Sequence, residues 1–147
     1  MKLIRQITIL CLAFCSFASL HAQVINTFPY FYDFENETQG STSCTGTYTM
    51  LQAGWVNATG DGQDWTANVN GTTSGSTGPS GDHTSGTGFY MYTETSSGCN
   101  GNTAYLETPY FDFTTIAVPQ LDFWYHLYGG TLGTLGVDAK IGANGTW

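Results

Sequence analysis

The chain has 147 residues, enough for one domain of ordinary size, and carries a net charge of −8 with only 10% charged residues. Its 19 glycines and 15% aromatic residues favour short strands joined by turns and leave few stretches that could form a helix. The negative charge excludes nucleic acids and anionic lipid surfaces as partners, because it repels their phosphate groups.

Residues 1–22 have the features of a secretory signal peptide. The N-terminal segment carries the cations Lys2 and Arg5 and is followed by an apolar run over residues 7–20. Ala22 supplies a small residue for cleavage before Gln23. The run is shorter than the roughly 20 residues of a membrane span, although a retained anchor is the alternative. No later run is apolar enough to span a membrane. The sequence therefore predicts an exported domain over residues 23–147, secreted or at the cell surface.

Two cysteines and one cation remain after cleavage. Lys140 then stands against 11 carboxylates, which gives a side-chain balance of −10. Cys44 and Cys99 predict one disulfide, because an exported chain folds in an oxidising compartment. Two free thiols are the alternative. A zinc site is disfavoured, since neither cysteine has a second cysteine or a histidine at ligand spacing.

The first half of the chain alternates strand-like and loop-like stretches. Residues 28–35 alternate in side-chain character and predict an edge strand, where Pro29 is tolerated. Trp55 and Trp65 flank a polar loop and are predicted to lie in the core. Residues 68–88 consist mainly of Gly, Ser, Thr, Asn and Pro, and predict a long surface loop within one domain.

Three short strands are predicted next. Residues 88–95 alternate cleanly, residues 104–107 form a short stretch that ends before Pro109, and residues 110–113 follow it. Turns rich in Gly, Asn and Thr separate these stretches. The regular alternation indicates sheets rather than helices.

Residues 121–128 predict the central strand of the fold, because they are large and largely apolar at both odd and even positions. Gly129 and Gly130 predict a turn into a partner strand over 131–135, which continues to residue 141. The predicted fold class is all-β, an antiparallel two-sheet β-sandwich. The core residues predicted for the central strand are Phe123, Trp124, Tyr125 and His126.

Short motifs along the chain resemble those of the MAM domain, the extracellular module of meprins, neuropilins and receptor tyrosine phosphatases. They are Tyr32-Asp33-Phe34-Glu35, Ala53-Gly54-Trp55, Asp64-Trp65, Thr77-Gly78-Pro79, Asp82-His83-Thr84, Gly88 to Glu94, Ala104 to Pro109, Phe123-Trp124-Tyr125-His126 and Gly133-Thr134-Leu135. The resemblance implies a two-sheet antiparallel jelly roll that continues for a few strands past Trp147, so we expect the sequence to be incomplete at its C-terminus.

The chain departs from this family at its cysteines. Tyr32, Ala53 and Gln120 occupy positions where the family has cysteine, so the usual disulfides of the family cannot form. A bond between Cys44 and Cys99 would be an arrangement of this chain's own.

The sequence contains no nucleophile elbow, metalloprotease helix or phosphate-binding glycine motif, and it predicts no enzymatic activity. His83 and His126 are more typical of structural than of catalytic or metal-binding histidines. The predicted cofactor is Ca²⁺, because acidic residues at strand ends and in glycine-containing loops can turn several oxygens toward one ion. The predicted ligands are Glu35 and Asp82, with Asp64 or Asp33. Solvated carboxylates without an ion are the alternative.

The resemblance implies a non-catalytic adhesion or interaction module. A calcium-dependent carbohydrate-binding jelly roll and an accessory domain of a secreted hydrolase or peptidase remain alternative functions. The expected partner is an extracellular protein or a glycan, with association between copies of the chain as a further option.

Overall fold

The computed structural model describes residues 23–50, 54–96, 98–130, 132–142 and 144–147. The predicted signal peptide, residues 1–22, lies outside these ranges. The described chain contains strands and no helix, which confirms the all-β fold class. Accordingly, these ranges hold no helix that is long and apolar enough to cross a membrane.

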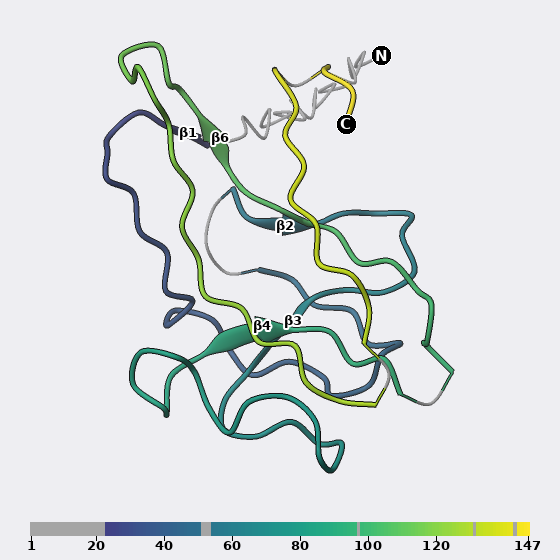
Figure 1. The fold of residues 1–147 in the computed structure, drawn as a ribbon. Coiled ribbons are helices and arrows are strands. Elements are labelled where there is room, and N and C mark those ends of the chain that lie inside the picture. Colours follow the sequence, from purple (N-terminus) through teal and green to yellow (C-terminus); the bar gives the residue numbers. More distant parts are fainter. Residues whose placement is uncertain (1–22, 51–53, 97, 131, 143) are drawn as a thin grey trace, which may run out of the picture.

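In the described ranges, six short strands pair into three two-stranded sheets (Figure 1). The strands are β1 (Val24–Ile25), β2 (Val56–Asn57), β3 (Thr66–Asn68), β4 (Tyr90–Tyr92), β5 (Leu106–Glu107) and β6 (Tyr110–Phe111). β3 pairs with β4 and β2 with β5, both antiparallel, as expected. β1 pairs with β6 in parallel, which differs from a wholly antiparallel fold. A parallel pair needs a long connection, and all the other strands lie between β1 and β6.

The core of the described chain is centred on β3 and β4. All three residues of β3 are buried, and Ala67 pairs with Met91 in the middle of the ladder. Across the same ladder, the Asn68 side-chain amide donates to the Tyr90 hydroxyl at 2.9 Å. The chain thus buries small and polar side chains here, and the buried Asn68 amide is hydrogen-bonded, whereas the buried hydroxyls of Thr66 and Tyr92 have no hydrogen-bond partner among the described residues.

The edge strand predicted for residues 28–35 does not form. Phe34 adopts a left-handed conformation with φ of 63°, which a non-glycine residue rarely takes and which ends an extended stretch. A turn follows, in which the Glu37 amide donates to the Phe34 carbonyl at 3.0 Å. The pairing with β6 is made by β1 instead, upstream of the predicted strand.

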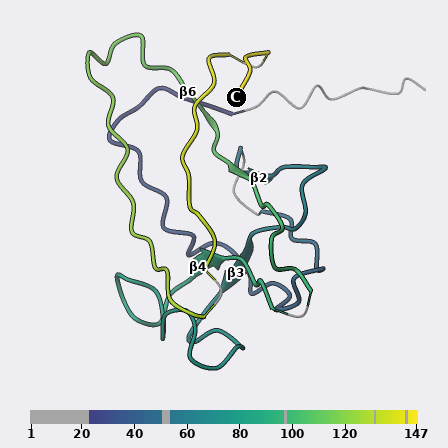
Figure 2. The ribbon, with the colours of Figure 1, turned by 45° about the vertical axis from the view of Figure 1, so that its right-hand side comes forward.

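The central hairpin predicted around Gly129 is present as a reversal of the chain but not as a ladder. Residues 119–128 run without a bend, turn at Gly129 and Gly130, and a second arm leads back toward the C-terminus (Figures 1 and 2). The two arms lie apart in both views, so their described residues form no strand pair. This separation explains why the predicted strands over 121–128 and the described part of 131–141 are absent.

Candidate functional site

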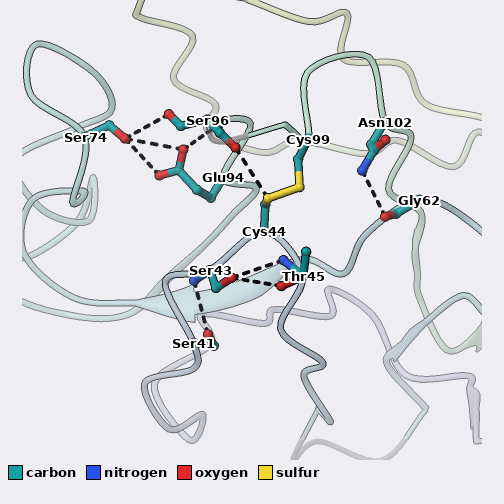
Figure 3. Close-up of a disulfide and its surroundings, with 10 residues drawn as sticks. All are labelled: Ser41, Ser43, Cys44, Thr45, Gly62, Ser74, Glu94, Ser96, Cys99 and Asn102. Atoms are coloured by element: carbon teal, nitrogen blue, oxygen red, sulfur yellow. Dashed lines mark hydrogen bonds between the residues drawn. A yellow bond between two sulfur atoms is a disulfide. The ribbon is translucent and has the colours of Figure 1, made fainter.

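A disulfide joins Cys44 to Cys99, with 6.1 Å between the two Cα atoms (Figure 3). The bond confirms the pairing predicted from the cysteine count. Both cysteines are buried, and the bond ties the loop before β2 to the turn after β4. Its loop of 55 residues therefore encloses β2, β3 and β4.

A polar cleft of about 380 Å³ lies beside the disulfide. Glu94 accepts hydrogen bonds there from the Ser74 hydroxyl at 3.2 Å and from the Ser96 amide at 2.8 Å (Figure 3). Burial alone would raise the pKa of the Glu94 carboxyl, but the hydrogen bonds from Ser96, Ser74 and Thr73 outweigh it and lower the pKa. Hydrogen bonds from the neighbouring serine and threonine residues thus hold the Glu94 carboxylate in place.

Two of the four predicted calcium ligands accept hydrogen bonds from consecutive backbone amides. The Gly88 amide donates to the Asp82 carboxylate at 2.7 Å, and the next amide, that of Phe89, donates to the Glu35 carboxylate at 3.1 Å. A Cβ atom on residue 88 would overlap with the Glu35 carboxylate, so a larger residue at this position would displace the Glu35 side chain from the Phe89 amide. The fold therefore brings the loop before β4 against the turn that contains Glu35.

Asp82 is the more strongly held of the two carboxylates. Besides Gly88, it accepts from the Thr84 amide at 2.9 Å and from the Ser85 amide and hydroxyl, each at 2.8 Å. The Ser85 amide and these further donors lower the pKa of Asp82 well below its usual range. Asp82 is therefore ionised at neutral pH and fixes the shape of its loop.

The other two predicted ligands have different partners. Asp64 accepts from the Tyr48 amide at 2.7 Å, and Asp33 accepts from the Glu35 amide at 3.2 Å. Within the described ranges, no three side chains of His, Cys, Asp or Glu form a group that could hold a metal ion. The structure thus brings Glu35 and Asp82 to consecutive amides but pairs Asp64 and Asp33 with other amides, and the calcium site stays a prediction.

Sequence reasoning missed Glu37, the most buried carboxylate of the described chain at 4% exposure. Glu37 accepts hydrogen bonds from the hydroxyls of Tyr32 and Tyr48. Burial, followed by the hydrogen bond and the charge of Glu37, raises the pKa of Tyr48 to about 12 and that of Tyr32 still further. Neither its polar sequence neighbours nor a spacing rule distinguishes Glu37 from a solvated carboxylate.

Trp55 and Trp65, predicted as core, are half-buried. The Trp55 indole packs on the rings of Tyr32 and Phe34, with centroid distances of 4.8 and 5.4 Å. The Trp65 indole nitrogen donates to the Ala104 carbonyl at 3.0 Å. Both tryptophans thus join segments that are distant in sequence.

The aromatic residues predicted as core in 121–128 are exposed instead. Phe123 is 49% exposed, Trp124 75% and Tyr125 69%, and His126 is also exposed. The prediction is wrong because it assumed that other parts of the fold cover both faces of this segment, whereas the described residues leave both faces exposed. Residues two apart contact one another, as Phe123 does with Tyr125, which is the alternation of an extended backbone.

The segment 121–128 consequently has two chemically different faces. We define the apolar face as Leu121, Phe123, Tyr125 and Leu127, and the Trp124 face as Asp122, Trp124, His126 and Tyr128. The Trp124 indole stacks on the His83 ring at 3.7 Å with 9° between the ring planes. The Gly78 amide also donates to the Tyr128 carbonyl at 3.2 Å. These two contacts fasten the segment to the loop between β3 and β4.

Comparison with known proteins identifies the family. Residues 33–145, well over half of the chain, match the family described as "MAM domain, meprin/A5/mu", and the chain therefore belongs to the MAM domain family. The all-β structure agrees with the β-sandwich that this family implies.

Several proteins are similar to part of the chain. Thyroid hormone-induced protein B of Xenopus laevis is 45% identical over 62 residues, and MAM domain-containing protein 2 of Homo sapiens is 44% identical over 64 residues. Neuropilin-1a of Danio rerio is 33% identical over 87 residues. These alignments cover 42%, 44% and 59% of this chain, and 9% of each relative. No solved structure matches the chain.

Proposed function

We propose that the chain is a non-catalytic interaction module of an exported protein, acting outside the cell or at its surface. The observation that carries this proposal is the apolar face of 121–128, whose four side chains are 49 to 69% exposed. Soluble monomers rarely expose apolar patches beyond a few hundred Å² unless these bind something. Membership of the MAM family, whose named relatives include a neuropilin, supports the same function.

Charge narrows the class of partner. With Lys140 as the only cation after residue 22, the domain repels phosphate-rich and other strongly anionic surfaces. An extracellular protein, a second copy of the chain or an uncharged glycan meets no such repulsion at the apolar face. Burying the four side chains of this face would stabilise a complex through the hydrophobic effect.

Adhesion of coated beads tests this function. Beads carrying the chain from residue 23 onward should adhere to surfaces coated with extracellular proteins or glycans, or to one another. The double variant Phe123→Ser/Tyr125→Ser should lose most of this adhesion, whereas Val24→Ser, which alters an exposed apolar residue outside 121–128, should retain it. Equal adhesion by the wild type and the double variant, both with the disulfide formed, would contradict the proposal.

We also propose that a calcium ion binds at Glu35 and Asp82. The observation that favours it is the meeting of these two carboxylates at the consecutive amides of Gly88 and Phe89. Two adjacent carboxylates repel each other, and a hard divalent cation with oxygen ligands would relieve that repulsion. The ion would cross-link the loop before β4 to the turn at Phe34 and offset part of their ordering entropy.

Thermal unfolding with calcium and with chelator tests the ion site. Calcium at a hundred times its dissociation constant should stabilise the wild type by about 2.7 kcal/mol. Glu35→Gln should abolish this response. Asp64→Asn is the matched control and should keep it, because Asp64 binds the Tyr48 amide. A midpoint that chelator leaves unchanged in the wild type would exclude the ion.

A further inference from the structure

We propose that the Trp124 face binds a neutral polysaccharide, with the open side of the Trp124 indole as the platform on which a sugar ring stacks. This inference rests on the proposed function as an interaction module. It names the chemical class of one partner, and it assigns that partner to a different face of 121–128 from the apolar face.

The stacking geometry leaves one side of the indole available. His83 covers one side in a nearly parallel stack, with 3.7 Å between ring centroids and 9° between planes. Because Trp124 is nevertheless 75% exposed, its opposite side faces solvent. A pyranose ring presents a flat surface of C–H groups that packs against such an aromatic face, while its hydroxyls point outward to polar groups. A large, flat and exposed indole provides that surface.

The platform is held in place before any ligand binds. His83 follows Asp82, whose carboxylate accepts hydrogen bonds from the amides of Thr84, Ser85 and Gly88 and so fixes the loop. The hydrogen bond between the Gly78 amide and the Tyr128 carbonyl fastens the other end of the segment. An aromatic side chain with a fixed orientation loses little entropy when it binds, which raises affinity.

The surroundings of the platform fit hydroxyl groups rather than anions. Asp122 lies two residues from Trp124 on the same face and is exposed, and its carboxylate accepts hydrogen bonds from the Gln120 side-chain amide at 2.9 and 3.0 Å. Carboxylates accept hydrogen bonds from sugar hydroxyls and repel sulfated or uronic-acid sugars. Lys140, which could pair with an anion, already contacts Glu107 at 3.8 Å and lies over the Trp147 ring.

The same arrangement argues against a protein partner at this face. The neighbours of Trp124 on its own face are Asp122, His126 and Tyr128, which all carry polar groups, whereas Phe123 and Tyr125 point to the other side of the extended segment. Cores of protein interfaces are depleted of charged residues. An exposed indole surrounded by the carboxylate of Asp122, the imidazole of His126 and the hydroxyl of Tyr128 is the smaller and wetter surface that a sugar requires.

Affinity electrophoresis tests the proposal. The chain from residue 23 onward is run in native gels that each contain one neutral polysaccharide: hydroxyethylcellulose, arabinoxylan, laminarin, galactomannan or soluble starch. At least one should retard the wild type. Trp124→Ala should weaken that retardation about tenfold or more, the equivalent of about 1.4 kcal/mol. Trp147→Ala is the matched control, since Trp147 is also exposed and contacts the Lys140 ammonium, and it should migrate as the wild type.

Variants of His83 separate the stack from a general effect on folding. His83→Ala removes the ring that fixes the indole and should weaken retardation, whereas His83→Phe preserves a stacking ring and should restore it. Equal loss in the alanine and phenylalanine variants would contradict the role of the stack.

The remaining outcomes distinguish this proposal from the function on which it rests. If no polysaccharide retards the wild type, or if Trp124→Ala binds as well as the wild type, the platform is refuted. If, in addition, the Phe123→Ser/Tyr125→Ser variant still loses adhesion to protein-coated beads, the interaction module stands without a sugar site. If that variant keeps both adhesion and retardation, the apolar face is refuted and the platform stands.

Discussion

Removing the disulfide is the perturbation whose effect follows most directly from the structure. The bond between Cys44 and Cys99 closes a loop of 55 residues that contains three of the six strands in the described part of the chain. On the chain-entropy model, opening a loop of this length destabilises the folded state by about 4 kcal/mol. Domains of this size unfold with about 5 to 15 kcal/mol in total, so the double variant Cys44→Ser/Cys99→Ser should be marginally stable.

Guanidinium unfolding followed by tryptophan fluorescence measures this loss. The double variant should have a free energy of unfolding about 4 kcal/mol lower than the oxidised wild type and a larger m-value, because its unfolded chain exposes more surface. A reductant should destabilise the wild type by a similar amount and leave the variant unchanged. A difference below about 1 kcal/mol would refute the reasoning, since it would show that the two loops stay together without the bond.

Three further predictions concern hydrogen-bonded side chains. Gly88→Ala should lower the unfolding midpoint and weaken any calcium response, because a Cβ atom overlaps with the Glu35 carboxylate; an unchanged melting curve would contradict this contact. Tyr48 has a folded pKa raised to about 12 against an ordinary value of about 10, so its contribution to stability is present below pH 10 and is lost as the pH rises toward 12. The free energy of unfolding, measured in urea between pH 9 and pH 12, should therefore fall less with rising pH in Tyr48→Phe than in the wild type. Asp82 has a lowered pKa, so its contribution is present above the unfolded value of about 3.9 and is lost as the pH falls below it. Acid titration of Asp82→Asn by circular dichroism should therefore show a shallower loss of structure below about pH 4 than the wild type.

Local sequence patterns located three strands and the cross-link. β4 lies within the alternating stretch 88–95, β5 within 104–107 and β6 within 110–113. The disulfide followed from counting the cysteines that remain after residue 22. In each case the decisive information is local, either an alternation of side chains or a pair of residues in an oxidising compartment.

Non-local contacts account for what the sequence could not predict. Residues 121–128 have the alternation of a strand, but alternation does not reveal whether a partner strand lies at hydrogen-bonding distance. Residues 28–35 also alternate, and the left-handed turn at Phe34 interrupts them. The parallel pairing of β1 with β6 depends on the path of the whole intervening chain.

Only part of the candidate site could be predicted from the sequence, because the rest depends on non-local contacts. Acidic residue types indicated Glu35 and Asp82, and the fold brings these two to adjacent amides. Asp64 is also acidic, but it accepts a hydrogen bond from the Tyr48 amide instead. This contact depends on the tertiary structure and could not be predicted from the sequence. Glu37 and the stack of His83 on Trp124 carry no sequence signal, because each depends on residues brought together by folding.

Amide hydrogen exchange tests most directly the claim that residues 121–128 are an extended segment open to a partner. Mass spectrometry of the chain from residue 23 onward should show that amides of this segment exchange at nearly the rate of an unstructured peptide, whereas those of β3 and β4 are protected by their ladder. Protection of 121–128 equal to that of β3 and β4 would show that the segment is already paired, and would contradict its role as the interaction surface.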